Sequence, residues 1–356
     1  MSNTKPNPAA ELRRGWTTGA CATAAAKAAY QALLTGVFPD PVEILLPKGE
    51  RPRFALSLKE LLPGGARVGI VKDAGDDPDV THGVTVIATV AMGGEGVRFK
   101  AGRGVGMVTK PGLPILPGEP AINPAPRRMM IDVITELAAA HGVEPNVEIE
   151  LSIPNGEDLA AKTWNVRLGI VGGLSILGTT GIVHPFSCSA WIHSIHRGID
   201  VARAIGLSHV AGATGSTSEA AVQRLYGLPP EALLDMGDFA GGMLKYLRDH
   251  PIPRVTVAGG FGKIAKLAQG SLDLHSSRSQ VDFAWLASLM PDAARQQTLQ
   301  ANTAQEVLEV ARAIGIDIVP EVARAALATV RKTLREAAIE TDVVIVNREG
   351  AILGRA

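Results

Sequence analysis

The sequence predicts an α/β protein of two domains, a mixed α+β N-terminal domain followed by a Rossmann-like domain with a doubly wound parallel sheet. Its 356 residues, 46% of them hydrophobic and 20% charged, are enough to fill two cores of ordinary size. Short β-branched runs separated by turn residues fill the first part of the chain, whereas strand-like and helix-like segments alternate in the second part. The 39 glycines are typical of an enzyme with tight turns that approach backbone or ligand.

The charge balance and the cysteines exclude several classes of protein. Lysine plus arginine equals aspartate plus glutamate, 35 each, so the chain lacks the broad basic field that nucleic acids and anionic membranes require. Cys21 and Cys188 form neither a CxxC pair nor a disulfide framework, and no metal site is expected from them. Residues 1–14 are polar, and the apolar stretch 166–183 is interrupted by glycine and threonine. We therefore expect a cytoplasmic enzyme with a small-molecule substrate.

The predicted first domain, residues 1–160, begins with a helix. Thr17 or Thr18 is a suitable cap for the alanine-rich run 21–34, which Gly36 and Pro39 end. Apolar runs bounded by turn residues then predict a mixed or antiparallel sheet. The expected strands are 42–46, 54–58, 66–71, 84–90, 98–101 and 147–153, with a second helix over 126–141.

The predicted second domain, residues 161–356, has regular strand–helix alternation, which indicates a parallel sheet. Its helical tail covers 303–338, and a closing hairpin, 343–346 with 351–353, is able to pair with either domain. The expected strands are 166–171, 208–212, 232–236 and 254–258, and the expected helices are 187–204, 218–226, 239–248 and 263–269.

Glycine-rich turns follow three of these strands. Such turns present backbone N–H groups, and ligands of open parallel sheets lie beyond the carboxyl ends of the strands. The turns at 172–181, 212–219 and 258–263 are therefore expected to converge on one crevice, although 172–181 also fits a turn that only packs strand against helix. The candidate cofactor-binding residues are Gly172, Gly173, Ser175, Thr179, Thr180, Gly181 and Thr214.

An acidic string, residues 72–83, places four aspartates and one histidine between Lys72 and Gly83. Such a string is able to bind a cation or to place an acid or base in a cleft. It is equally consistent with a solvated turn in which Asp76 and Asp79 serve as caps. Asp73, Asp76 and His82 are the candidate catalytic residues.

Basic side chains beside constrained backbone are suited to a polycarboxylate. They are also consistent with proline-stiffened surface loops. The spacing of His193 and His196 indicates packing more than metal binding. The candidate substrate-binding residues are Lys110, Arg127, Arg128, Lys263, Lys266 and His275.

Several long motifs, taken together, resemble one family, the cobalt-precorrin-5B methyltransferases of anaerobic cobalamin biosynthesis (the CbiD type). They appear in the family's order from about residue 12 to 282, whereas the tail after Val281 carries no motif of this kind. The motifs are GWTTG (15–19), KDAGDDPDVT (72–81), GVGMVTKPGL (104–113), GEPAINP (118–124), GGLSILGTTGIV (172–183) and GKIAKLA (262–268), followed by His275.

The resemblance implies methyl transfer from S-adenosylmethionine to C-1 of cobalt-precorrin-5B, a cobalt-containing tetrapyrrole with acetate and propionate side chains, giving cobalt-precorrin-6A. It also implies a fold unlike that of the common tetrapyrrole methyltransferases. The donor would lie over 172–181 with its nucleoside near Thr214, while Asp73, Asp76 or His82 polarises the ring or accepts a proton. A homo-oligomer is compatible with the sequence. The alternatives are a nucleotide-dependent oxidoreductase and a non-catalytic corrinoid-binding protein.

Overall fold

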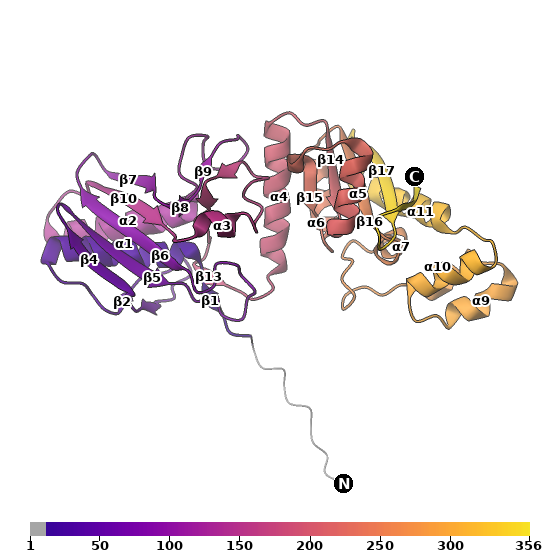
Figure 1. Ribbon diagram of the computed structural model, residues 1–356, viewed down its shortest axis with the longest axis horizontal. Helices are drawn as coiled ribbons and strands as arrows, with labels where there is room; N and C mark the ends of the chain where they lie inside the picture. The colour runs from indigo at the N-terminus through magenta and orange to yellow at the C-terminus, as the bar shows by residue number, and fades with distance from the viewer. Residues whose placement is uncertain (1–11) are drawn as a thin grey trace, which may run out of the picture. The chain divides into compact units, whose positions relative to one another are not determined.

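A computed structural model describes residues 12–356, in two compact units; the first ends at Ser187 and the second begins at Cys188 (Figure 1). Each unit is described by itself. The polar N-terminal segment noted in the sequence lies outside the described residues over positions 1–11. Among residues 12–356, no helix has the length and the apolar character that crossing a bilayer requires. The α/β class predicted from the sequence is confirmed.

The first unit is built on a five-stranded mixed sheet in the order β4-β5-β6-β10-β7. Neighbouring strands are antiparallel except β10 and β7, which are parallel. Its elements are β1 (Gly15–Trp16), α1 (Thr18–Thr35), β2 (Val42–Glu43), β3 (Arg53–Phe54), β4 (Leu58–Leu62), β5 (Gly65–Val71), β6 (Thr85–Met92), β7 (Val97–Ala101), β8 (Gly104–Val105), β9 (Met107–Val108), α2 (Pro124–His141), β10 (Val147–Ser152), α3 (Gly156–Ala160), β11 (Ile170–Val171), β12 (Gly173–Leu174) and β13 (Ile182–Val183).

Helix α1 is the central helix of this unit. The Thr17 side chain accepts a hydrogen bond from the N–H of Ala20 at the N-terminus, and Gly36, with φ of 76°, ends the helix in the left-handed conformation. Its alanines are buried on nearly all sides, because the helix packs against α2, β5 and β6. Small side chains permit this close approach, so α1 holds its first turn firmly against the sheet.

The glycine-rich segment 172–181 lies in the first unit. The predicted strand over 166–171 is wrong, because only Ile170–Val171 is extended, and it pairs with β9 instead of starting a parallel sheet. β12 pairs with β8, and β13 pairs with β1. The predicted boundary after residue 160 therefore falls within the first compact unit. Periodicity did not reveal this, since two-residue bridges carry no periodic signal.

The second unit contains a five-stranded sheet in the order β15-β14-β16-β17-β18. The first four strands are parallel, and β18 is antiparallel to β17. Its elements are α4 (Cys188–Ala204), β14 (His209–Ala213), α5 (Ser216–Tyr226), the 3₁₀ turn η1 (Pro230–Ala232), β15 (Leu233–Asp235), α6 (Ala240–Asp249), β16 (Arg254–Gly260), α7 (Phe261–Ala268), α8 (Phe283–Ser288), α9 (Asp292–Leu299), α10 (Ala304–Ala313), α11 (Val319–Leu334), β17 (Glu340–Val346) and β18 (Ile352–Arg355).

The helices and the closing hairpin complete the core of the second unit. α6 packs against α4 and α11, and α11 packs against α7, while α5 contacts β14, β16 and β17. The predicted tail forms two helices, α10 and α11, separated at Gly315, which has φ of 74°. The sequence did not decide which domain the closing hairpin joins. In the structure the hairpin, β17 and β18, belongs to the sheet of the second unit, because β17 pairs with β16.

Candidate functional site

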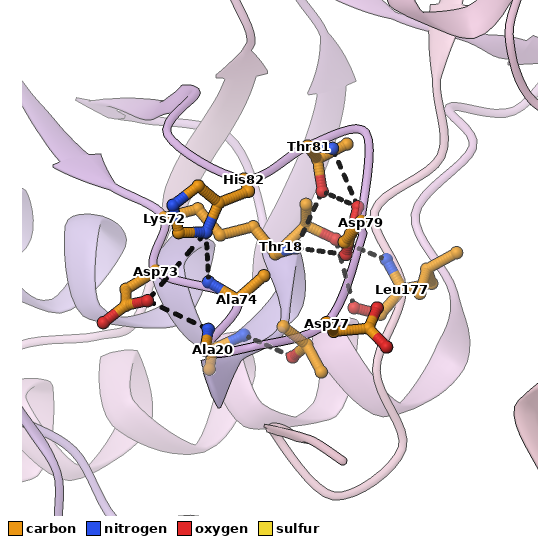
Figure 2. Close-up of polar contacts among 12 residues, drawn as sticks. Thr18, Ala20, Lys72, Asp73, Ala74, Asp77, Asp79, Thr81, His82 and Leu177 are labelled. Carbon is orange, nitrogen blue, oxygen red and sulfur yellow. Dashed lines mark hydrogen bonds and ion pairs between the residues drawn. The ribbon is translucent and has the colours of Figure 1, made fainter. Parts of the chain in front are cut away.

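The acidic string folds around a buried lysine. The Lys72 side chain is 1% exposed, and its Nζ donates to Asp79 and, at 2.7 Å, to Thr81 Oγ1 (Figure 2). Asp79 Oδ1 also accepts from the N–H and the hydroxyl of Thr81, at 2.8 and 2.6 Å. Burial raises the pKa of Asp79, but Lys72 and these hydrogen bonds outweigh burial, so the pKa lies below its ordinary value. Part of the string is therefore a structural clamp.

Asp73 and Asp76 are both held by Arg13. The Arg13 guanidinium forms an ion pair with Asp73, and the Arg13 N–H donates to Asp76 Oδ2 at 2.6 Å. The hydrogen bonds from Arg13, together with the N–H of Gly75, lower the pKa of Asp73. A side chain at Gly15 would collide with the backbone of Ala74, so the loop lies directly on β1. Sequence reasoning missed Arg13, since two arginines before the first element carry no motif.

His82 lies beside Asp73 at the end of the same loop. Its Nδ1 accepts the N–H of Ala74 at 3.1 Å and is 3.9 Å from Asp73 Oδ1 (Figure 2). An Nδ1 that accepts a hydrogen bond assigns the proton of the neutral ring to Nε2. The side chain is 52% exposed, so Nε2 is accessible to a ligand. The three candidate catalytic residues are thus brought together on one loop.

The glycine-rich segment reaches the first turn of α1, and the acidic loop contacts β1, directly before that turn. The N–H groups of Thr17 and Gly19 donate to the carbonyls of Gly181 and Leu177, at 3.0 and 2.9 Å. The N–H of Leu177 donates to Thr18 Oγ1 at 3.1 Å, and the N–H of Trp16 donates to the carbonyl of Asp73. The loop 72–83 and the segment 172–181 therefore share one support.

Most glycines of this segment are explained by close packing. A Cβ at Gly173 would lie 2.4 Å from the backbone of Gly104, and one at Gly181 would lie 2.5 Å from Leu46. Gly178, with φ of 132°, lies against the capping side chain of Thr17. Only Gly172 has open space around its Cβ position. The packing interpretation therefore accounts for Gly173, Gly178 and Gly181, which leaves Gly172 and the hydroxyl residues as the ligand-facing candidates.

We expect Gly178→Ala to destabilise the first unit by about 3 kcal/mol, because it combines backbone strain with displacement of the Thr17 cap. Gly172→Ala is the matched control, since it also has a positive φ but meets no neighbouring atom. The two melting temperatures, measured by calorimetry, should differ clearly. Equal melting temperatures would show that Gly178 is not required for packing.

The remaining candidate cofactor residues differ in exposure. Thr179 is exposed, whereas Thr180 and Ser175 are half-buried. Thr180 Oγ1 accepts the N–H of Ile182 at 3.3 Å, and Ser175 Oγ donates to the side-chain oxygen of Asn165 at 3.4 Å. Thr214 lies in the second unit, at the end of β14. The expectation that 172–181 shares one sheet edge with 212–219 and 258–263 is therefore wrong.

A pocket of about 680 Å³ lies at the carboxyl ends of the parallel strands in the second unit. The loops after β14 and β16, which the sequence singled out, form two of its walls. In the order β15-β14-β16, the strand order reverses between β14 and β16. Ligands of open α/β sheets bind at such a reversal. Its lining residues are Thr214, Gly215, Ser216, Thr217, Ser218, Gly260, Phe261, Gly262, Lys263, Lys266, Val281, Thr303, Ala304, Gln305, Val346, Asn347 and Arg348.

Two of the predicted basic residues of the second unit line this pocket. Lys263 pairs with Asp238 at 3.0 Å and donates to the carbonyl of Thr214 at 3.2 Å. Lys266 is 8% exposed, and its Nζ donates to the carbonyl of Leu274 at 3.0 Å. His275 is exposed beside Ser277 and is not a lining residue. The sequence did not identify Arg348, although its place after a strand of the sheet was a usable signal.

The basic candidates of the first unit have different roles. Arg127 pairs with Glu119 at 3.0 Å, donates to the carbonyls of Ile122 and Pro120, and lies over the ring of Phe99. Arg127 therefore fixes a loop. The Lys110 side chain packs over Gly169, and Arg128 is exposed on α2. Within residues 12–356, no group of three or more histidine, cysteine, aspartate or glutamate side chains is arranged to hold a metal ion.

The comparisons with known proteins decide the family. The CbiD family model matches residues 5–185, and the model of the CbiD C-terminal domain matches residues 273–356. The chain belongs to the CbiD family. The match to the tail corrects the expectation that residues after Val281 carry no family signal, and the first match ends close to the last residue of the first compact unit.

Curated relatives match over nearly the whole chain. The chain is similar to the cobalt-precorrin-5B C(1)-methyltransferase of Brucella anthropi, with 62% identity over 99% of this chain and 97% of that protein. The protein of the same name from Paramagnetospirillum magneticum is 63% identical over 97% of this chain and 98% of its own length. The crystal structure of the cobalamin biosynthesis protein (cbiD) from Archaeoglobus fulgidus matches 75% of this chain and 83% of its own, with 28% identity and a TM-score of 0.41.

Proposed function

We propose that this protein is the C-methyltransferase that converts cobalt-precorrin-5B into cobalt-precorrin-6A in anaerobic cobalamin biosynthesis. The observation that carries the proposal is the identity of 62% over 99% of the chain to a relative of that activity. The match extends over both units of this chain. The methyl acceptor is a cobalt-containing tetrapyrrole, and the cobalt belongs to the substrate.

We infer that S-adenosylmethionine is the methyl donor and that it binds in the first unit. Its sulfonium is a cation, and the acidic loop provides an exposed carboxylate, Asp76, which the N–H of Arg13 positions. Thr179 and Thr180 lie on the neighbouring segment, where they would hold the polar groups of the nucleoside. The pocket of the second unit fits the donor less well, since no aspartate or glutamate is among its described lining residues. Bound in the first unit, the donor would supply an activated methyl group.

The residues of the acidic loop then have separate tasks. Methyl transfer from a sulfonium depends mainly on alignment, so rigid placement contributes much of the rate. The Lys72–Asp79 clamp holds the loop, and Arg13 orients Asp73 and Asp76. Asp76 or the accessible Nε2 of His82 would polarise the acceptor ring or exchange a proton with it. Lys110 and Arg128 stay candidates for contacts with the carboxylates of the substrate.

We further infer that the second unit is a doubly wound, Rossmann-like sheet. The order of its parallel strands, with neighbours that are not consecutive in the chain, supports this. The connection from β14 to β15 through α5 and the connection from β15 to β16 through α6 run in opposite directions across the sheet. If both crossovers are right-handed, α5 and α6 lie on opposite faces of the sheet. The cytoplasmic location, the absence of a nucleic-acid partner and a possible homo-oligomer stay predictions from the sequence.

The test is a direct assay under reducing, anaerobic conditions. The purified protein, S-adenosylmethionine and cobalt-precorrin-5B should yield S-adenosylhomocysteine and a tetrapyrrole heavier by one methyl group, as read by mass spectrometry. A control with heat-inactivated protein separates enzymatic from spontaneous methylation. If both substrates are bound but neither product forms, the protein is a carrier and the proposal fails.

A further inference from the structure

The pocket of the second unit has a marked excess of positive charge. Lys263, Lys266 and Arg348 line it, whereas none of its described lining residues is acidic. Asp238 pairs with Lys263 from outside the lining, and Asp273, also outside it, acts on Lys266 at longer range. A pocket of about 680 Å³ with this composition is large enough for a small molecule or for a substantial part of a larger one. Its electrostatics therefore select for anions.

Two helices present their N-termini to the pocket. The first turns of α5 and α7 line it, and at neither N-cap, Gly215 or Gly260, does a side chain bond to the helix. The first N–H groups of a helix have no partner within the helix, so they are available to an acceptor. A Cβ at Gly215 or Gly260 would meet no atom within 4 Å, so both glycines border open space. The donors that the pocket offers are therefore accessible.

Lys266 is the observation that points to a ligand. It is 8% exposed, yet its Nζ bonds only to the carbonyl of Leu274, and no carboxylate pairs with it in the part of the chain that the structure describes. Buried charges in proteins are normally paired, because an uncompensated one is costly. Burial lowers the pKa of Lys266, and the charge of Lys263 adds to this effect, against smaller opposing effects of Asp238 and Asp273, neither of which forms an ion pair with it. An anion bound in the pocket would supply the missing counter-charge.

We propose that this pocket binds carboxylate groups of a polycarboxylated tetrapyrrole, with Lys266 as their buried counter-charge. The proposal rests on the proposed function, which provides a substrate with acetate and propionate side chains. S-adenosylmethionine carries a net positive charge, and nothing in the lining would neutralise it. The helix N-termini and Lys266 suit carboxylate oxygens, and exposed Arg348 offers a further cation at the rim.

The decisive variant is Lys266→Met, which keeps the length of the side chain and removes its charge. Lys245→Met, an exposed lysine of α6 outside the pocket, is the matched control. The probe is uroporphyrin, an octacarboxylic porphyrin, titrated against the full-length protein and followed by its absorbance. We expect Kd to rise about 10-fold or more in Lys266→Met, because a charge-assisted contact is lost, and to stay unchanged in Lys245→Met. Binding of S-adenosylmethionine, measured by calorimetry, should be unaltered.

The melting temperature separates a ligand contact from a structural role. If Lys266 serves a ligand, replacing a buried unpaired charge with methionine leaves the ligand-free protein as stable as before or more stable. If the contact with Leu274 only fixes the loop, the melting temperature falls and porphyrin affinity does not change, which overturns the proposal. Loss of S-adenosylmethionine binding with intact porphyrin binding overturns it too, since the pocket would then be the donor site.

A second variant keeps the test independent of Lys266. Gly260→Val places a side chain in the open space of the pocket at a φ of −69°, which valine adopts without strain. We expect weaker porphyrin binding at an unchanged melting temperature. Both binding experiments are independent of turnover, so an inactive protein that binds porphyrin through Lys266 would contradict the proposed function and leave the pocket assignment standing.

Discussion

Asp79→Asn is expected to destabilise the first unit by about 3 kcal/mol, because it leaves the ammonium of Lys72 buried without a charged partner. Lys72 is 1% exposed and Asp79 25% exposed in this pair, so solvent screens it far less than a surface ion pair. The melting temperature of the first unit should fall by roughly 6–12 °C, measured by differential scanning calorimetry. A fall of about 1 °C or less would show that the clamp does not hold the loop.

The pH dependence gives this prediction a second readout. The folded pKa of Asp79 lies below its unfolded value, so the stabilisation is complete above about pH 4 and is lost as the pH falls through the folded pKa. The difference between wild type and Asp79→Asn should be constant at neutral pH and should shrink in that acidic range. The double variant Lys72→Met/Asp79→Leu should recover part of the lost stability, because it removes both charges together.

Asp76→Asn should reduce kcat by about 100-fold while leaving the melting temperature within roughly 1 °C of wild type. The Asp76 side chain is exposed, and the amide oxygen of asparagine is still able to accept the N–H of Arg13. What the variant removes is the negative charge that, in the proposed function, acts on the donor or the acceptor ring. The measurement is single-turnover methyl transfer at saturating donor, combined with calorimetry.

Asp132→Asn, on the exposed face of α2, is the control for removing one carboxylate from the same unit. It should change neither rate nor stability. Should Asp76→Asn lower the melting temperature by several degrees and keep full activity, the acidic string is a structural turn throughout. In that case His82 would become the remaining candidate for an acid or base on this loop.

Local signals in the chain were sufficient for most individual elements. The cap at Thr17 and the glycine at Gly36 mark both ends of α1, and regular spacing predicts β14, α5, β16 and the hairpin to within a few residues. Short bridges such as β11–β9 and β12–β8 were not predictable, because their partners are distant in the chain and their register depends on packing. The same limit led to the wrong placement of the segment 172–181.

The candidate sites were predictable as loops but not as assemblies. The acidic string and the glycine turns after β14 and β16 stand out in the sequence, and the structure brings each set together. Arg13 and Arg348 belong to no motif. Arg13 reaches the acidic loop because β1, which follows it, pairs with β13, and Arg348 reaches the pocket because β17, which precedes it, pairs with β16. The buried state of Lys266 likewise has no sequence signal, since a lysine three residues after another normally marks an exposed face.

By itself, the sequence determined the class of the fold, the helix caps, the neutral charge balance and the family, because these depend on residue type and local spacing. Tertiary structure alone decided that the glycine-rich segment supports the first turn of α1, and that a lysine lining the pocket of the second unit lies buried without an ion-pair partner. The physical reason is that burial and pairing depend on contacts between residues far apart in the chain, and local patterns do not encode such contacts.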